Sequence, residues 1–110
     1  MNLIDKRCTR TPPALHGVEL TNMLAQVPGW VVADGMLRCS FAFSDYHQTI
    51  AFVNALAWVS HGEDHHPELL VTYQRCAVSY ATHSAGGELT ENDFVCAARA
   101  SALYAQRVGA

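Results

Sequence analysis

The spacing of hydrophobic and polar residues changes along the chain from a helical period to a strand period and back. Over residues 15–27, apolar side chains recur every three or four positions, which predicts a first helix that Pro28-Gly29 ends. Residues 30–33 and 36–43 are strand-like, and Asp34-Gly35 between them supplies the positive φ angles that a two-residue hairpin turn requires. The first part of the chain is therefore predicted to be one helix followed by a β-hairpin.

The middle of the chain repeats this alternation with a longer helix. Ser44-Asp45 can cap a helix that runs to about Gly62 and carries a broad apolar face. Residues 69–73 and 76–82 then predict two further strands, and the second of these alternates in polarity. The broad apolar face of the helix requires a sheet beneath it.

A glycine-bearing turn at residues 84–89 precedes the last predicted helix. Thr90, followed three residues later by Asp93, matches a capping box, so this helix begins there and runs toward Gln106. The order α-β-β-α-β-β-α, with short links, predicts an α+β fold in which a four-stranded antiparallel sheet carries three helices on one face. The prolines that end residues 1–13 cannot continue a helix, so this segment is predicted to be an extended arm over the surface.

Composition limits the classes of function. The chain has 110 residues, which is room for one domain, and we expect that domain to span residues 1–110. A net charge of -3 with no basic block argues against electrostatic binding to nucleic acid or to a membrane surface. The four cysteines form no Cys-x-x-Cys pair, and neither a signal peptide nor a membrane span is recognisable, so we expect a cytoplasmic protein with reduced thiols.

Candidate chemistry is concentrated in a 23-residue window that holds four of the six histidines: His61, His65, His66 and His83. The ordinary pKa of an imidazole, about 6.5, suits proton transfer near neutral pH, and its nitrogens also suit metal binding. His61 and His65 have the helical spacing of zinc ligands, but Gly62 stands where a zinc hydrolase motif has its glutamate. Proton transfer is therefore favoured, and the zinc hydrolase remains an alternative.

The predicted fold can bring these histidines together. Pro67 biases His66 away from helical geometry at the end of the second helix, and His83 ends the fourth predicted strand. Because that helix should pack across the sheet, His83 could converge with His65 and His66 around one pocket. Each histidine taken alone also fits a surface position at the end of an element.

Two further side chains have two interpretations each. Tyr73 fits a cross-strand packing position and also the lining of a ligand pocket. Asp93 fits the acid of a capping box, and a carboxylate at a helix N-terminus can in addition hold the tautomer of a facing histidine. The sequence leaves both choices open.

Taken together, these positions closely resemble the signature of the pterin-4a-carbinolamine dehydratase family: His65-His66-Pro67, Tyr73, Thr82-His83, Gly86-Gly87 and residues 89–93. The resemblance covers most of the chain from Trp30 onward, and the family fold agrees with the order of elements predicted above. The family usually has glutamate where His61 stands. It also has one residue fewer between the strand-end histidine and the aspartate, and Glu88 is the extra residue here.

The resemblance implies dehydration of a 4a-hydroxytetrahydropterin, such as the tetrahydrobiopterin derivative, to the quinonoid dihydropterin during recycling of the pterin. It implies no metal and no cofactor, because the pterin is the substrate. His65 and His83 would be the acid/base pair that flanks the C4a hydroxyl, His66 would bind or polarise the pterin ring, and Asp93 would orient a histidine. The implied substrate pocket consists of Asp64, His65, His66, Pro67, Ala81, Thr82, His83 and Ser84.

The same resemblance allows a function without catalysis. Family relatives include a dimerisation cofactor of a transcription factor and assembly factors for a carboxylating enzyme, so a binding scaffold on this fold is the second hypothesis. The complete set of three imidazoles and the proline favours the enzyme, because a scaffold has no chemical need for them. The resemblance also implies a homodimer or homotetramer and a functional link to an aromatic amino-acid hydroxylase.

Overall fold

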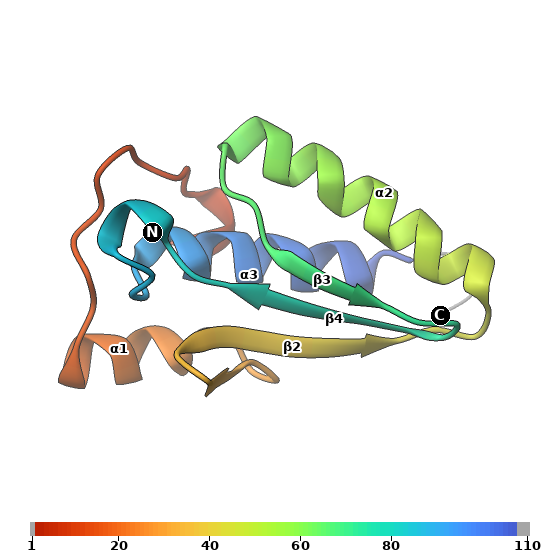
Figure 1. Ribbon diagram of the computed structural model, residues 1–110, viewed down its shortest axis with the longest axis horizontal. Helices are drawn as coiled ribbons and strands as arrows, with labels where there is room; N and C mark the ends of the chain where they lie inside the picture. Colours follow the sequence, from red (N-terminus) through yellow and green to blue (C-terminus); the bar gives the residue numbers. More distant parts are fainter. Residues whose placement is uncertain (1, 108–110) are drawn as a thin grey trace.

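The computed structural model describes residues 2–107 (Figure 1). Its elements, in chain order, are the 3-10 helix η1 (Leu3–Asp5), α1 (Gly17–Leu24), β1 (Val31–Ala33), β2 (Met36–Ala42), α2 (Tyr46–Glu63), β3 (Glu68–Val71), β4 (Arg75–Tyr80), the 3-10 helix η2 (His83–Ala85) and α3 (Glu91–Ala105). The strands pair antiparallel in the order β1-β2-β4-β3. The predicted α+β fold and its α-β-β-α-β-β-α order are confirmed, and the two 3-10 helices are additions that the sequence did not predict.

One face of the sheet supplies the core. In the register of β2 and β4, Leu37 lies opposite Tyr80 and Phe41 lies opposite Cys76, and all four side chains are buried. Helices α2 and α3 contact each other, and each also contacts a central strand. Figure 1 shows α3 running behind β3 and β4, with α2 on the other side of it from β2. The alternation predicted for residues 36–43 therefore places one set of side chains under the helices.

Three short sequence patterns adopt the local structures that they predict. Asp34 and Gly35 have φ angles of 54° and 76°, as the hairpin turn requires. The Asp45 carboxylate caps α2 by accepting a hydrogen bond from the backbone N–H of Gln48 at 2.8 Å. Thr90 and Asp93 form the capping box of α3. Each signal depends on residues that are close in sequence, which is why it can be recognised without the fold.

The predicted bounds of three elements were wrong. Helix α1 covers Gly17–Leu24 rather than residues 15–27, because His16 is extended and the N–H of Leu15 donates to the carbonyl of Leu89 at 2.8 Å. Strand β4 ends at Tyr80 rather than at residue 82, since Thr82 makes its bonds outside the strand pairing. Strand β3 ends at Val71 rather than at residue 73.

The N-terminal arm, residues 2–13, is packed onto the helices. Leu3 is buried in the core, and the arm continues as extended chain toward the end of α2. The Lys6 ammonium lies 3.0 Å from a Glu91 carboxylate oxygen, and the Arg99 guanidinium donates to the Lys6 carbonyl at 2.6 Å. Residue 1 of the predicted arm lies outside the described residues. The arm is thus fixed against α3 by contacts that join opposite ends of the chain.

Candidate functional site

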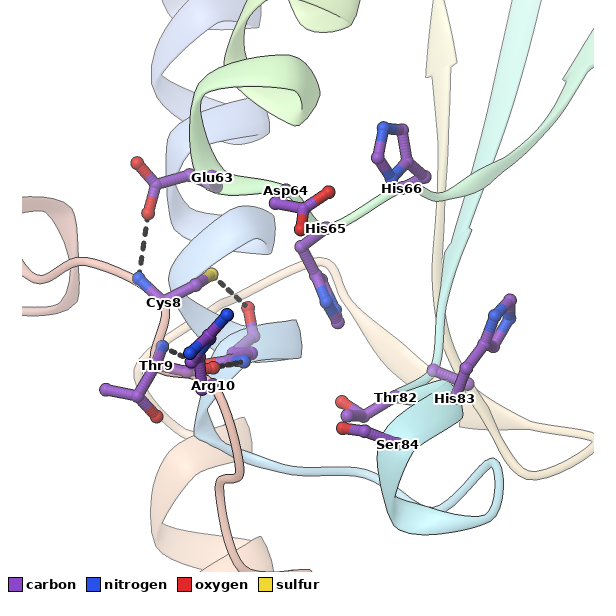
Figure 2. Close-up of a pocket in the computed structure, with 12 residues that line it drawn as sticks. Cys8, Thr9, Arg10, Glu63, Asp64, His65, His66, Thr82, His83 and Ser84 are labelled. Carbon is purple, nitrogen blue, oxygen red and sulfur yellow. Dashed lines mark hydrogen bonds between the residues drawn. The ribbon is translucent and has the colours of Figure 1, made fainter.

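The site begins where α2 ends. Asp64 caps the helix in the left-handed conformation, with φ 51° and ψ 45°, and the N–H of His65 donates to the carbonyl of Ser60 at 3.2 Å. After this turn the side chain of His65 is buried and that of His66 is exposed. Figure 2 shows the His65 ring turned toward the side where Thr82 lies and the His66 ring pointing the opposite way. Two adjacent histidines thereby occupy different environments.

His65 is bonded to a fully buried carboxylate. Its Nε2 lies 2.7 Å from Oδ1 of Asp93, whose side chain is completely inaccessible to solvent. The other carboxylate oxygen of Asp93 accepts hydrogen bonds from the N–H of Thr90 at 2.9 Å and from the hydroxyl of Thr82 at 2.8 Å. Asp93 therefore caps α3 and holds His65 at the same time, so the two interpretations of this residue are compatible.

The hydrogen bonds around Asp93 determine which ring nitrogen of His65 carries a proton. The Thr82 hydroxyl donates to Asp93, so it accepts from the Thr90 hydroxyl 2.7 Å away, and Thr90 in turn accepts from the N–H of Asn92 at 3.2 Å. Every group around the carboxylate is a donor, and an ionised carboxylate is an acceptor only. We therefore assign a proton to Nε2 of His65, which leaves Nδ1 as the nitrogen that can take or give a proton.

Tyr80 fixes the plane of the His65 ring. The two rings are stacked with centroids 5.8 Å apart and an interplanar angle of 11°. Tyr80 is fully buried in β4, and burial raises the pKa of its phenol above the ordinary value, so the ring stays neutral. The alternation of β4 placed Tyr80 on the core face but gave no sign of its contact with a histidine.

A cavity of about 590 Å³ opens beside His65 (Figure 2). A volume of this size suits a small organic ligand. The residues that line it are Cys8, Thr9, Arg10, Glu63, Asp64, His65, His66, Ala81, Thr82, His83, Ser84 and Asn92. All of the predicted substrate-binding residues except Pro67 are among them, and Asp93 lies behind His65 rather than in the wall. Their roles in binding and catalysis stay predictions.

The arm contributes a wall that the sequence did not predict. The N–H of Cys8 donates to Oε1 of Glu63 at 2.8 Å. Thr9 and Asn92 exchange two hydrogen bonds, from the Thr9 N–H to the side-chain oxygen at 2.9 Å and from the side-chain amide to the Thr9 carbonyl at 2.8 Å. Arg10 follows this fixed segment and lines the cavity. No local signal marks these residues, because their partners lie 55 and 83 positions away.

The Glu63 carboxylate is the main attachment of the arm to α2. Burial of the carboxyl opposes its ionisation, but the hydrogen bonds from the Cys8 N–H and the Arg7 guanidinium outweigh burial and lower the pKa of Glu63. A carboxyl whose pKa is lower in the folded state contributes stability above its ordinary value of 4.5 and loses that contribution as the pH falls through the lower folded value.

Glu63→Gln is therefore expected to reduce the free energy of unfolding by about 1 kcal/mol at pH 7, because the amide weakens both charge-assisted bonds. The difference from the unsubstituted protein should shrink as the pH falls below the ordinary pKa of 4.5 and should disappear below the lowered folded pKa, where the carboxyl is protonated. Urea unfolding at several pH values measures both effects. Glu68→Gln on the exposed strand β3 is the matched control, and an equal loss in that variant would contradict the assignment.

The remaining histidine and tyrosine candidates lie outside the cavity. His61 is exposed on α2 with its ring edge-on to Trp58, at a centroid distance of 6.1 Å. Tyr73 is exposed and stacks on Tyr46 with centroids 6.4 Å apart.

Within residues 2–107, no three His, Cys, Asp or Glu side chains are grouped as metal ligands would be. Over the same residues, no helix has the length and apolar character needed to cross a membrane.

Two known proteins are similar in sequence to this chain over most of its length. A protein of Xanthomonas euvesicatoria is 57% identical over 98 residues, which cover 87% of this chain and 82% of the relative. A protein of Nitrosospira multiformis is 48% identical over 99 residues, covering 90% of this chain and 87% of the relative. Both are named "Putative pterin-4-alpha-carbinolamine dehydratase".

Two solved structures are also similar. A Brucella melitensis protein described as a transcriptional coactivator/pterin dehydratase has a TM-score of 0.78 and 31% identity, covering 83% of this chain and 98% of its own. A pterin dehydratase-like protein described as a RuBisCO assembly factor in the alpha-carboxysome has a TM-score of 0.58 and 30% identity, covering 68% of this chain and 86% of its own.

The family model described as "Pterin 4 alpha carbinolamine dehydratase" matches residues 13–103. This match includes every cavity residue except the three that the arm contributes. The resemblance inferred from the histidine signature is therefore confirmed, and the chain belongs to the pterin-4-alpha-carbinolamine dehydratase family.

Proposed function

We propose that this protein removes water from a 4a-hydroxytetrahydropterin by histidine acid/base catalysis and so returns a quinonoid dihydropterin for recycling. Membership of the dehydratase family supports the reaction class. The observation that carries the proposal is the buried Asp93–His65 pair, which opens on a cavity that His66 and His83 also line. The tetrahydrobiopterin derivative, the product of an aromatic amino-acid hydroxylase, is the substrate that we propose.

The chemistry requires two proton transfers. The C4a hydroxyl takes a proton and leaves as water, N5 loses its proton, and a C4a–N5 double bond forms. His65 and His83 are proposed to flank the hydroxyl and make these transfers, His65 through Nδ1, while His66 contacts the pterin ring. The Asp93 carboxylate on Nε2 stabilises the imidazolium that forms whenever Nδ1 takes a proton. Asp93 is thus a positioning residue in this proposal.

Stopped-flow mixing of the protein with synthetic 4a-hydroxytetrahydropterin tests the activity directly. Ultraviolet absorbance follows formation of the quinonoid product, and the rate should rise in proportion to protein concentration above the spontaneous reaction. A rate equal to the spontaneous one at all protein concentrations would contradict the proposal. Comparison of substrates with different C6 side chains would then show which pterin is preferred.

A chelator is expected to leave this activity unchanged. The proposed steps need only proton transfer, and Nε2 of His65, the nitrogen a zinc ion could have used, is already bonded to Asp93. The measurement compares turnover before and after incubation with EDTA, with zinc added back to a parallel sample. Loss of turnover in EDTA followed by recovery with zinc would favour the metal-dependent alternative.

A binding role is the second candidate. The two similar solved structures are described as a coactivator/dehydratase and as an assembly factor. The surface of this chain also exposes large apolar side chains, namely Trp58 on α2, Leu70 on β3 and Tyr73 in the following turn. Such side chains suit a protein contact. An inactive protein in the stopped-flow assay would leave this role as the better explanation of the fold.

We also propose that the protein is a homodimer or homotetramer. Strand β3 is an edge of the sheet and all four of its residues are exposed, so a second copy can cover its unpaired backbone groups. Multi-angle light scattering at micromolar concentration should give a multiple of 12.0 kDa. A mass of one chain across the accessible concentration range would contradict this proposal.

A further inference from the structure

The arm brings one cysteine against another at the edge of the cavity. The Sγ atoms of Cys8 and Cys96 are 3.6 Å apart, although the two residues are 88 positions apart in sequence. Cys8 is half-buried and lines the cavity, whereas Cys96 is fully buried in α3. The other two cysteines, Cys39 and Cys76, lie in β2 and β4 under the helices. One thiol of the close pair is therefore accessible from the cavity and the other is shielded.

We propose that Cys8 and Cys96 form a reversible disulfide when the protein meets a peroxide, which makes the arm wall of the cavity a redox modification site. The site lies outside the residues that we propose for proton transfer. It is also independent of the proposed function, because the bond can form whether or not the protein dehydrates a pterin.

Hydrogen peroxide is the oxidant in the proposed reaction, which has two steps. The Cys8 thiolate attacks one peroxide oxygen, the O–O bond breaks, and the products are a Cys8 sulfenic acid and hydroxide, which takes up the thiol proton as water. The Cys96 thiol then loses its proton as its sulfur attacks the Cys8 sulfur, the S–O bond breaks, and the sulfenic hydroxyl takes up that proton and leaves as a second water. Two sulfurs lose two electrons in total, and the peroxide gains them.

The surroundings distinguish the two thiols. The hydrogen bond to Cys8 and burial raise the pKa of Cys96, so Cys96 stays a thiol and is the resolving partner. Cys8 is directed at the carbonyl of Asn92, with Sγ 3.7 Å from that oxygen (Figure 2). The accessible thiol of Cys8 is therefore the one that the oxidant reaches first.

Bond formation requires a small movement of the arm. A disulfide bond is about 2.05 Å long, so the sulfurs must approach by about 1.5 Å from their present separation of 3.6 Å. Cys96 belongs to a regular helix, whereas Cys8 lies in extended chain held mainly by side-chain hydrogen bonds. Most of the movement should come from Cys8, and it would alter the cavity wall that Cys8 helps to form.

Graded hydrogen peroxide treatment of the full chain tests the inference. Peptide mapping under non-reducing conditions should recover a cross-linked pair that contains Cys8 and Cys96, and two of the four thiols should be lost per chain and return with dithiothreitol. The melting temperature should rise by several degrees, because the bond closes a long loop. Cys39 and Cys76 should remain reduced.

Two cysteine variants separate loss of the cross-link from loss of the fold. Cys8→Ser should keep the fold, since the residue is only half-buried at the edge of the core, and should abolish both the cross-link and the thermal shift. Cys39→Ser is the matched control and should retain both. Four free thiols after treatment, or Cys8 oxidised to sulfinic acid without a cross-link to Cys96, would overturn the inference. Neither result depends on whether the dehydratase assay succeeds.

Discussion

Replacing Asp93 with asparagine is expected to lower turnover by roughly two to four orders of magnitude while the protein still folds. The asparagine oxygen can keep the hydrogen bonds from the Thr90 N–H and the Thr82 hydroxyl. Its NH₂ group then faces Nε2 of His65, where the proton now lies, and two donors cannot share a hydrogen bond. The imidazole proton must move to Nδ1, so Nδ1 loses the lone pair that could accept a proton.

Thr90→Ala separates this effect from the loss of a helix cap. It should lower stability by about 1 kcal/mol and affect turnover much less, because the contact between Asp93 and His65 remains. Stopped-flow turnover and the melting temperature should be measured for both variants. Turnover that is unchanged in Asp93→Asn would reduce Asp93 to the cap of α3 and remove it from the proposed mechanism.

Alanine at His65 or at His83 is expected to lower turnover by a similar factor, roughly two to four orders of magnitude, which is the usual contribution of an acid or base. The two variants should differ in stability. Without His65, the fully buried Asp93 loses a charge-assisted hydrogen bond, so the free energy of unfolding should fall by about 1–3 kcal/mol. His83 is exposed at the start of η2, so its removal should leave the melting temperature nearly unchanged.

His61→Ala is the matched control for these variants, because His61 is exposed on α2 and does not line the cavity. Its turnover and its melting temperature should both stay close to those of the unsubstituted protein. The acid/base assignment would be wrong if His65→Ala and His83→Ala both turned over the substrate as fast as His61→Ala.

The sequence predicted those parts of the fold that depend on neighbouring residues. The Asp34-Gly35 turn, the Asp45 cap and the capping box of α3 are each decided within four positions, and all were recognised. The four-stranded antiparallel sheet was also predicted, from the order of elements and their short links, whereas its strand order β1-β2-β4-β3 was not predicted. The predicted end of β4 was wrong, since the N–H of Thr82 donates to the carbonyl of Glu88 instead of continuing the strand pairing.

The histidines of the candidate site could be predicted from the sequence, but the residues that hold them in place and complete the cavity could not. Spacing and proline placement indicated that His65, His66 and His83 could meet. The stack of Tyr80 on His65 and the arm wall depend on packing between distant segments, and neither has a periodicity or motif. The resemblance implied that Pro67 belongs to the pocket, yet Pro67 does not line the cavity, and the chain after it continues into β3.

The way in which the arm is attached makes part of the cavity separable from the rest. Cys8 and Thr9 are held by Glu63 and Asn92, and none of the hydrogen bonds of the arm involves the proposed acid/base histidines. The family match also begins at residue 13, after this wall. Exchange of the arm between relatives could therefore change the range of accepted ligands while the bond between Asp93 and His65 is preserved. The fold thus joins a separable arm wall to a cavity beside the bond between Asp93 and His65.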